Sequence, residues 1–98
     1  MAIYSIWESR FPAAAAEEGR AATEAIWRDM PDYDGYLDHE LLIDADDPGH
    51  LFVVSRWASR EHADEVLRRY AGHPNARAVD SLVTEPRRRT VALSTAAT

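Results

Sequence analysis

Residues 35–74 read GYLDHELLIDADDPGHLFVVSRWASREHADEVLRRYAGHP, and this stretch decides the fold. Two runs rich in β-forming residues, 36–43 and 51–57, lie on either side of an acidic turn that contains Pro48 and Gly49. A Pro-Gly turn between two such runs is a hairpin signal. The stretch therefore predicts two antiparallel strands, followed directly by a helix.

Two segments have the apolar spacing of amphipathic helices. One begins after Ser59, a residue type that caps helix N-termini, and ends at Gly72 and Pro74. The other begins at Pro12 and ends before Pro31. Their apolar positions recur three and four residues apart. In the helix that begins at Pro12, the predicted apolar stripe is Ala15, Gly19, Ala22, Ile26 and Met30. In the helix that begins after Ser59, it is Ala63, Val66, Leu67 and Tyr70.

The remaining segments complete the order. Residues 3–9 alternate and predict a first strand, 75–83 predict a short third helix, and 90–93 predict a last strand. The order β-α-β-β-α-(α)-β is that of the ferredoxin-like, split βαβ fold of the α+β class. Its antiparallel sheet has helices on one face only. We expect a second copy of the chain to cover the other face in a homodimer.

Length and composition limit the classes of protein to consider. A chain of 98 residues with 46% hydrophobic residues predicts one domain, 1–98, with a core of about 3–93 and a frayed tail, 94–98. The net charge of −6 argues against binding to nucleic acid or to an anionic membrane surface. No signal peptide or membrane span is recognisable, so a cytoplasmic location is expected. The absence of Cys excludes disulfides and thiolate chemistry.

Alternation along the strands predicts which side chains face the helices. The predicted helix-facing sets are Ile3, Ser5, Trp7 and Ser9; Leu37, His39, Leu41 and Ile43; and Leu51, Val53, Ser55 and Trp57. Together with Tyr70 they would form a mostly apolar pocket with a few polar groups, typical of a small-molecule site. The candidate substrate-binding residues are Trp7, Ser55, Trp57 and Tyr70.

His39 is the candidate catalytic residue. A histidine among aromatic side chains can act as a general base near neutral pH. The alternative is a core histidine that is hydrogen-bonded to a backbone carbonyl or to Ser55. For Trp57 two interpretations also remain, a structural side chain that closes the core or a wall of the pocket.

No metal or cofactor site is predicted. The carboxylates at 44, 46 and 47 lack the twelve-residue calcium loop with its closing Glu. The histidines show no metal-ligand spacing, and no glycine-rich phosphate loop suggests a nucleotide or flavin.

The run 35–74 resembles the antibiotic biosynthesis monooxygenase domain, and the resemblance extends over residues 3–93. It consists of a Gly-aromatic start, an acidic Asp-Pro-Gly hairpin, a strand ending in Trp57, a helix capped by Ser59 and a His-Pro break. The resemblance implies a dimeric α/β barrel, in which two ferredoxin-like subunits pack sheet against sheet. The characterised members of the family carry out cofactor-independent oxygenation of polycyclic aromatic polyketides or degrade haem, and many relatives have no known substrate.

The two chemistries can be compared residue by residue. The haem-degrading members are marked by an Asn on the first strand, a Trp in the second helix and a His about ten residues later. The matching positions here hold Ser9, Val66 and Ala76 or Arg77, which argues against haem degradation. The polyketide-oxidising members resemble this chain at Trp57, but their pocket Asn is replaced by Val53.

The sequence therefore leads to three hypotheses. The first is a cofactor-free monooxygenase that uses O2 on a small aromatic or quinone-like metabolite, with His39 as the base. The second is a non-catalytic dimeric small-molecule-binding or stress-associated protein of the same fold. The third is a polyketide cyclase or isomerase that uses His39 without O2.

Overall fold

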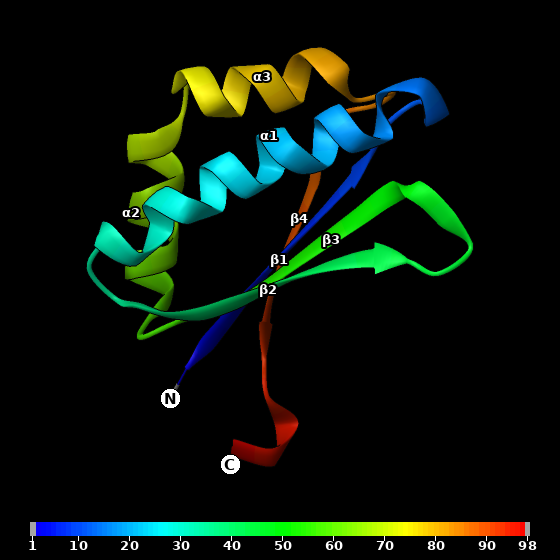
Figure 1. The fold of residues 1–98 in the computed structure, drawn as a ribbon. Coiled ribbons are helices and arrows are strands. Elements are labelled where there is room, and N and C mark those ends of the chain that lie inside the picture. The colour runs from blue at the N-terminus through cyan, green and yellow to red at the C-terminus, as the bar shows by residue number, and fades with distance from the viewer. Residues whose placement is uncertain (1, 98) are drawn as a thin grey trace.

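The computed structural model describes residues 2–97 and has the α+β, ferredoxin-like architecture that the sequence predicts (Figure 1). Four strands form an antiparallel sheet in the order β2-β3-β1-β4, and the helices lie against one face. The strands are β1 Ile3–Arg10, β2 Tyr36–Asp44, β3 Asp47–Trp57 and β4 Arg88–Leu93. The α-helices are α1 Ala16–Asp29, α2 Arg60–Tyr70 and α3 Pro74–Leu82, and three short 3-10 helices are η1 Ala13–Ala15, η2 Met30–Asp32 and η3 Thr95–Ala97.

The C-terminal end of the chain contains one short element. Residues 95–97 form η3, and the frayed tail expected over 94–98 stays a prediction. Thr98 lies outside the described residues.

The third helix, predicted over 75–83, is present as α3. Pro74 is its first residue, and the His73 side chain caps its N-terminus.

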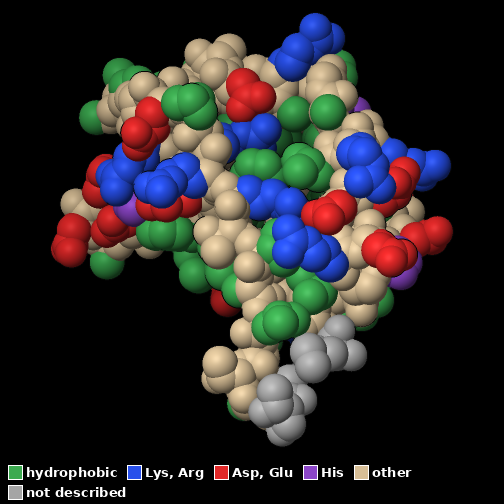
Figure 2. Space-filling view, turned by 180° about the vertical axis from the view of Figure 1, so that it is seen from behind, with side chains coloured by type: hydrophobic (Ala, Val, Ile, Leu, Met, Phe, Trp, Pro, Cys, Tyr) green, Lys and Arg blue, Asp and Glu red, His purple; other side chains and the backbone are tan. Residues whose placement is uncertain are grey.

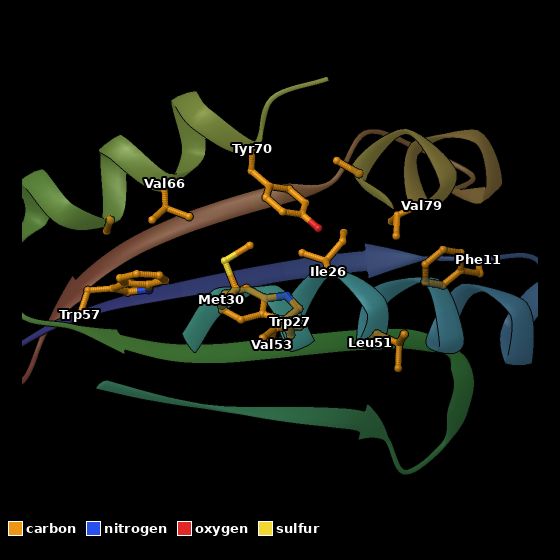
Figure 3. Close-up of a cluster of buried hydrophobic side chains, with 12 residues drawn as sticks. Phe11, Ile26, Trp27, Met30, Leu51, Val53, Trp57, Val66, Tyr70 and Val79 are labelled. Atoms are coloured by element: carbon orange, nitrogen blue, oxygen red, sulfur yellow. The ribbon is translucent and has the colours of Figure 1, made fainter. Parts of the chain in front are cut away.

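The core lies between the sheet and the three helices. The predicted inward sets of β1 and β3 are confirmed, because Ser5, Ser9, Leu51, Val53, Ser55 and Trp57 are all buried and Trp7 packs against the core. In Figure 3, side chains of α2 and α3 point toward those of β3 and α1. The helices supply Ile26, Trp27, Ala63, Val66, Tyr70, Ala76 and Val79.

A close contact fixes the position of α1. A Cβ atom at Gly19 would come within 2.5 Å of the Phe11 ring, which is buried. Phe11 is held in turn by its backbone N–H, which donates to the Gly49 carbonyl at 2.7 Å. Gly19 thus lets α1 approach the end of β1.

The predicted orientation of side chains in β2 is wrong at the start of the strand. A register irregularity lies between Tyr36 and Asp38, so Leu37 is 46% exposed instead of facing the helices. Tyr36 takes the inner position and packs edge-on against Trp57, with ring centroids 5.6 Å apart. A bulge of one residue reverses the alternation on one side of it, because the side-chain period of a strand is two.

The outer face of the sheet carries a partly exposed apolar patch. Ile6 is paired with Val54, and Leu42 with Phe52, on adjacent strands. Among residues 2–97, no helix covers this face (Figure 1). An apolar face of this kind fits the expected interface between two copies of the chain.

Candidate functional site

A cavity of about 250 Å³ lies between the inner face of the sheet and the three helices. Trp7, Val53 and Trp57 line it from the sheet, and Trp27 and Tyr70 line it from α1 and α2. Its volume is just below the range of roughly 300–1,000 Å³ for small-molecule sites. Its walls are aromatic and aliphatic, with a few polar groups, so a small aromatic ligand suits it.

Hydrogen bonds fix the sheet side of the cavity. The indole Nε1 of Trp57 donates to Ser55 Oγ at 3.1 Å, and Ser55 Oγ donates to the Ser5 carbonyl at 2.8 Å. Ser55 is 0% exposed and does not line the cavity. The structure therefore places Ser55 behind Trp57 as its support, instead of in the wall as predicted, while Trp57 both closes the core and lines the cavity.

His39 lies outside the cavity, which is a correction to the expected arrangement. It faces the helices from β2, but its ring packs against Trp27, with centroids 5.2 Å apart. Trp27 lines the cavity and also a shallow hollow that contains His39, so the indole separates the two spaces. The sequence missed this separation because Trp27 lies beside the predicted stripe of α1, and alternation along β2 carries no information about it.

The partner of His39 is Tyr36. The Tyr36 hydroxyl lies 2.6 Å from His39 Nδ1. Burial, with a contribution from Asp38, raises the pKa of Tyr36, so its hydroxyl keeps its proton. Burial lowers the pKa of His39, which favours the neutral imidazole. His39 is thus hydrogen-bonded, but to Tyr36 instead of the backbone carbonyl or Ser55 that the sequence suggested.

Two arginines that the sequence analysis did not single out line the cavity. The guanidinium carbon of Arg87 lies 4.8 Å from the centroid of the Trp7 ring, which is cation–π geometry, and its Nε donates to Asp80 at 2.8 Å. Arg89 donates from Nε to Ser5 Oγ at 3.3 Å and from Nη2 to Asp64 at 3.0 Å. Both side chains are largely buried.

These arginines bring two guanidinium groups to one side of a mostly apolar cavity, each paired with a carboxylate, Asp80 for Arg87 and Asp64 for Arg89. Figure 2 shows the side of the molecule opposite to Figure 1, where Arg side chains surround a central group of hydrophobic side chains. Arg89 could have been identified from the sequence as a residue of the inner face, because strand alternation places it on the same face as its neighbour Trp7. A cation beside aromatic walls favours a ligand that is electron-rich or negatively charged.

Tyr70 lines the cavity as predicted and has a carboxylate partner. Its hydroxyl donates to Asp29 Oδ2 at 2.7 Å, and Asn75 Nδ2 lies 3.2 Å from the hydroxyl and 3.3 Å from the same carboxylate oxygen. Burial and the bond to Asp29 raise the pKa of Tyr70 to about 12. The His73 ring stacks on the phenol, with centroids 4.2 Å apart.

A second polar cluster lies away from the cavity, near the β2–β3 turn. Nδ1 of His50 is 2.8 Å from Asp44, and Nε2 is 2.5 Å from Glu8. Since both ring nitrogens face carboxylates, the imidazolium, with two N–H donors, fits this site best. The bond to Asp44, joined by that to Glu8, raises the pKa of His50 above its ordinary value of 6.5, against the opposing effects of burial and of the Arg10 charge.

This cluster makes stability depend on pH. Because the pKa of His50 is higher in the folded protein, its protonated form stabilises the fold at low pH, and this contribution is lost as the pH rises through the raised pKa. We expect His50→Gln to destabilise the protein more at about pH 6 than at about pH 9. Urea unfolding of both proteins across this range measures the difference, and a difference that does not change with pH would contradict the assignment.

No group of three or more His, Asp or Glu side chains in residues 2–97 has an arrangement that could hold a metal ion. No helix in the same range is long and apolar enough to cross a membrane.

Residues 2–70 match the family model described as antibiotic biosynthesis monooxygenase. This is more than half of the chain, and the chain belongs to that family. A comparison with curated proteins gives no match.

Solved structures agree with this fold. A Nitrosomonas europaea protein named for antibiotic biosynthesis monooxygenase is 18% identical and has a TM-score of 0.86, with 99% of this chain and 93% of that chain covered. Rv0793 from Mycobacterium tuberculosis is 24% identical, with a TM-score of 0.77 and coverage of 96% and 95%. SnoaB, a cofactor-independent oxygenase from Streptomyces nogalater, is 19% identical, with a TM-score of 0.70 and coverage of 96% and 93%. At these identities the likeness establishes the fold and leaves the reaction open.

Proposed function

We propose that this chain is a cofactor-independent monooxygenase that acts on a small aromatic or quinone-like metabolite. The observation that carries the proposal is the cavity itself, which has Trp7, Trp57 and Tyr70 as aromatic walls and two arginines at one side. The solved relative SnoaB, described as a cofactor-independent oxygenase, supports the same class of chemistry.

The chemistry needs an electron-rich anion. A phenol or anthrone that has lost a proton can pass an electron to O2, and the two radicals then join through a carbon–oxygen bond. For an anthrone methylene, loss of water from the resulting hydroperoxide gives a carbonyl. One oxygen atom of O2 ends in the product and the other in water, so no further reductant is needed.

The contribution of the protein would be to favour that anion. Arg87 and Arg89 lie in a cavity walled by apolar groups, where a positive charge acts on a bound anion far more strongly than in water. They would lower the pKa of a bound phenol. The position of His39 behind Trp27 does not support the role of base that the sequence predicted.

The test is oxygen-dependent turnover of dithranol, a dihydroxyanthrone, by metal-free protein. We expect O2 uptake and quinone formation above the buffer rate in air, and none under anaerobic conditions. Trp7→Leu removes the cavity wall on which the Arg87 guanidinium lies and should reduce turnover about tenfold or more. Absence of turnover with dithranol and with related phenols would contradict the proposal.

His39→Ala serves as the matched variant in the same assay. We expect near wild-type turnover, because Trp27 separates the imidazole from the bound substrate. A loss of about 10²-fold in His39→Ala would instead restore His39 as the base.

A non-catalytic binding protein is the second candidate. It is favoured by one observation, that among the described residues no imidazole lines the cavity. Binding of dithranol without oxygen consumption would support it. The homodimer through the outer face, a location in the cytoplasm and a cyclase activity stay predictions, and sedimentation at micromolar concentration tests the first of them.

A further inference from the structure

The Tyr70 side chain lies between the cavity and an acidic hollow on the outside of the molecule. Tyr70 lines the cavity and is 6% exposed. Its hydrogen-bond acceptor Asp29 borders the outer hollow, as does His73, whose ring stacks on Tyr70. The other residues of the hollow are Asp32, Tyr33, Asp34 and Arg69. One phenol and one carboxylate thus connect the two spaces.

The position of Asp29 is unusual for a purely structural carboxylate. Asp29 is the last residue of α1, and the C-terminal end of a helix disfavours a negative charge. Packing of Tyr70 would be served equally well by a neutral acceptor at this position. Asn75 already supplies a neutral amide, which lies within hydrogen-bond distance of both partners.

We propose that Tyr70 and Asp29 form a proton route from the cavity to solvent, and that a bound phenol or anthrone ionises through it. This inference rests on the proposed function, which requires the substrate to become an anion. It names Tyr70 as the group that touches the substrate and Asp29 as a residue that acts through Tyr70.

The proton transfer balances without a further reactant. The substrate gives a proton to Tyr70 Oη, from the hydroxyl of a phenol or from the acidic methylene C–H of an anthrone, while the Tyr70 phenol gives its own proton to Asp29 Oδ2. The electron pair of the broken O–H or C–H bond stays on the substrate, which becomes an anion beside Arg87 and Arg89. Asp29 then releases the proton to water in the outer hollow and returns to the carboxylate form.

The charges around the phenol fit a relay better than a base. Because the pKa of Tyr70 is about 12, the phenol is protonated at neutral pH and can accept a proton only while it donates one. Asp29, Tyr33 and His73 face it from the outer side. On the cavity side, the charged lining residues are Asp80, Arg87 and Arg89. Two of these three are cations that would hold the substrate anion.

Three variants separate this role from a structural one. Asp29→Asn keeps a hydrogen-bond acceptor for Tyr70 but cannot take up a proton at neutral pH. Tyr70→Phe keeps the ring and removes the hydroxyl. Asp32→Asn is the control, since Asp32 borders the same hollow but has no bond to Tyr70 among the described residues.

The first measurement is anaerobic. Protein and dithranol are mixed without O2, and the absorbance of the anion reports ionisation of the bound anthrone across pH. We expect Asp29→Asn and Tyr70→Phe to ionise it about 10²-fold more slowly than the wild type at neutral pH, with the affinity for dithranol nearly unchanged. At high pH, where hydroxide can take the proton, both variants should approach the wild-type rate. Asp32→Asn should behave as the wild type throughout.

The outcomes are distinguishable. Equal ionisation rates and equal pH profiles in the wild type and in Asp29→Asn would overturn the proton route, even if oxygen-dependent turnover is observed. Wild-type ionisation no faster than in buffer would overturn it as well. Fast ionisation in the wild type, slow ionisation in both variants and no oxygen uptake would support the route and contradict the oxygenase. If one variant does not fold, the pH profile of the other decides.

Discussion

Replacement of Trp57 by alanine is expected to lower the free energy of unfolding by about 3–5 kcal/mol. The indole is 2% exposed, packs against Tyr36 and is held by Ser55. Alanine would leave a cavity between β3 and α2, and it would also remove the part of the ligand site that Trp57 lines. A chain of this length has a total stability of roughly 5–10 kcal/mol, so the variant would be close to unfolding at room temperature.

Urea denaturation followed by far-UV circular dichroism measures this effect. Leu37→Ala is the matched control, because the bulge exposes Leu37 to solvent and a surface substitution of this kind changes stability by about 0.5 kcal/mol or less. A loss below about 1 kcal/mol in Trp57→Ala would show that the sheet side of the cavity does not depend on the indole.

The burial of Trp57 and its neighbours follows from a pattern that is visible in the sequence. Alternation in β3 is uninterrupted from Leu51 to Trp57, and all four inward residues are buried. Each inward residue fills space beneath a helix, so hydrophobicity and strand period point to the same answer. The fold could be predicted for the same reason, since Pro12 and Ser59 each mark a helix start that the structure retains.

The site was less predictable because it depends on contacts between distant elements. The bond from Tyr70 to Asp29 joins residues 41 positions apart, and the contact of Arg89 with Asp64 joins residues 25 apart. Neither pair has a spacing rule in the sequence. The misplacement of His39 has a different cause: its face was assigned correctly, but Trp27 from α1 occupies the space between it and the cavity.

Replacement of Arg89 by methionine is expected to weaken binding of a phenolate ligand by roughly 10- to 100-fold. A hydrogen bond to a charged group contributes about 1.5–3 kcal/mol, and each 1.4 kcal/mol is a factor of about ten in affinity. Two donor nitrogens of Arg89 are used by Ser5 and Asp64, and among the described residues Nη1 has no partner, so it is left for a ligand. Methionine replaces the aliphatic part of the side chain and removes the guanidinium group with its charge and donors.

A comparison of the affinities for a phenol and for its methyl ether isolates the contribution of the ligand's negative charge. The ether has the same rings and cannot ionise, so Arg89→Met should bind it about as well as the wild type does. Arg88→Met is the matched control, because the next position along β4 points to the opposite face and is exposed. Equal losses in the two variants would indicate a general effect of net charge.

Asp64, whose pKa the bond from Arg89 holds below its usual range, keeps Arg60 as a second partner at 3.5 Å. The variant should therefore remain folded, and a selective loss of phenolate affinity would identify Arg89 as the residue that makes this aromatic cavity a site for anions.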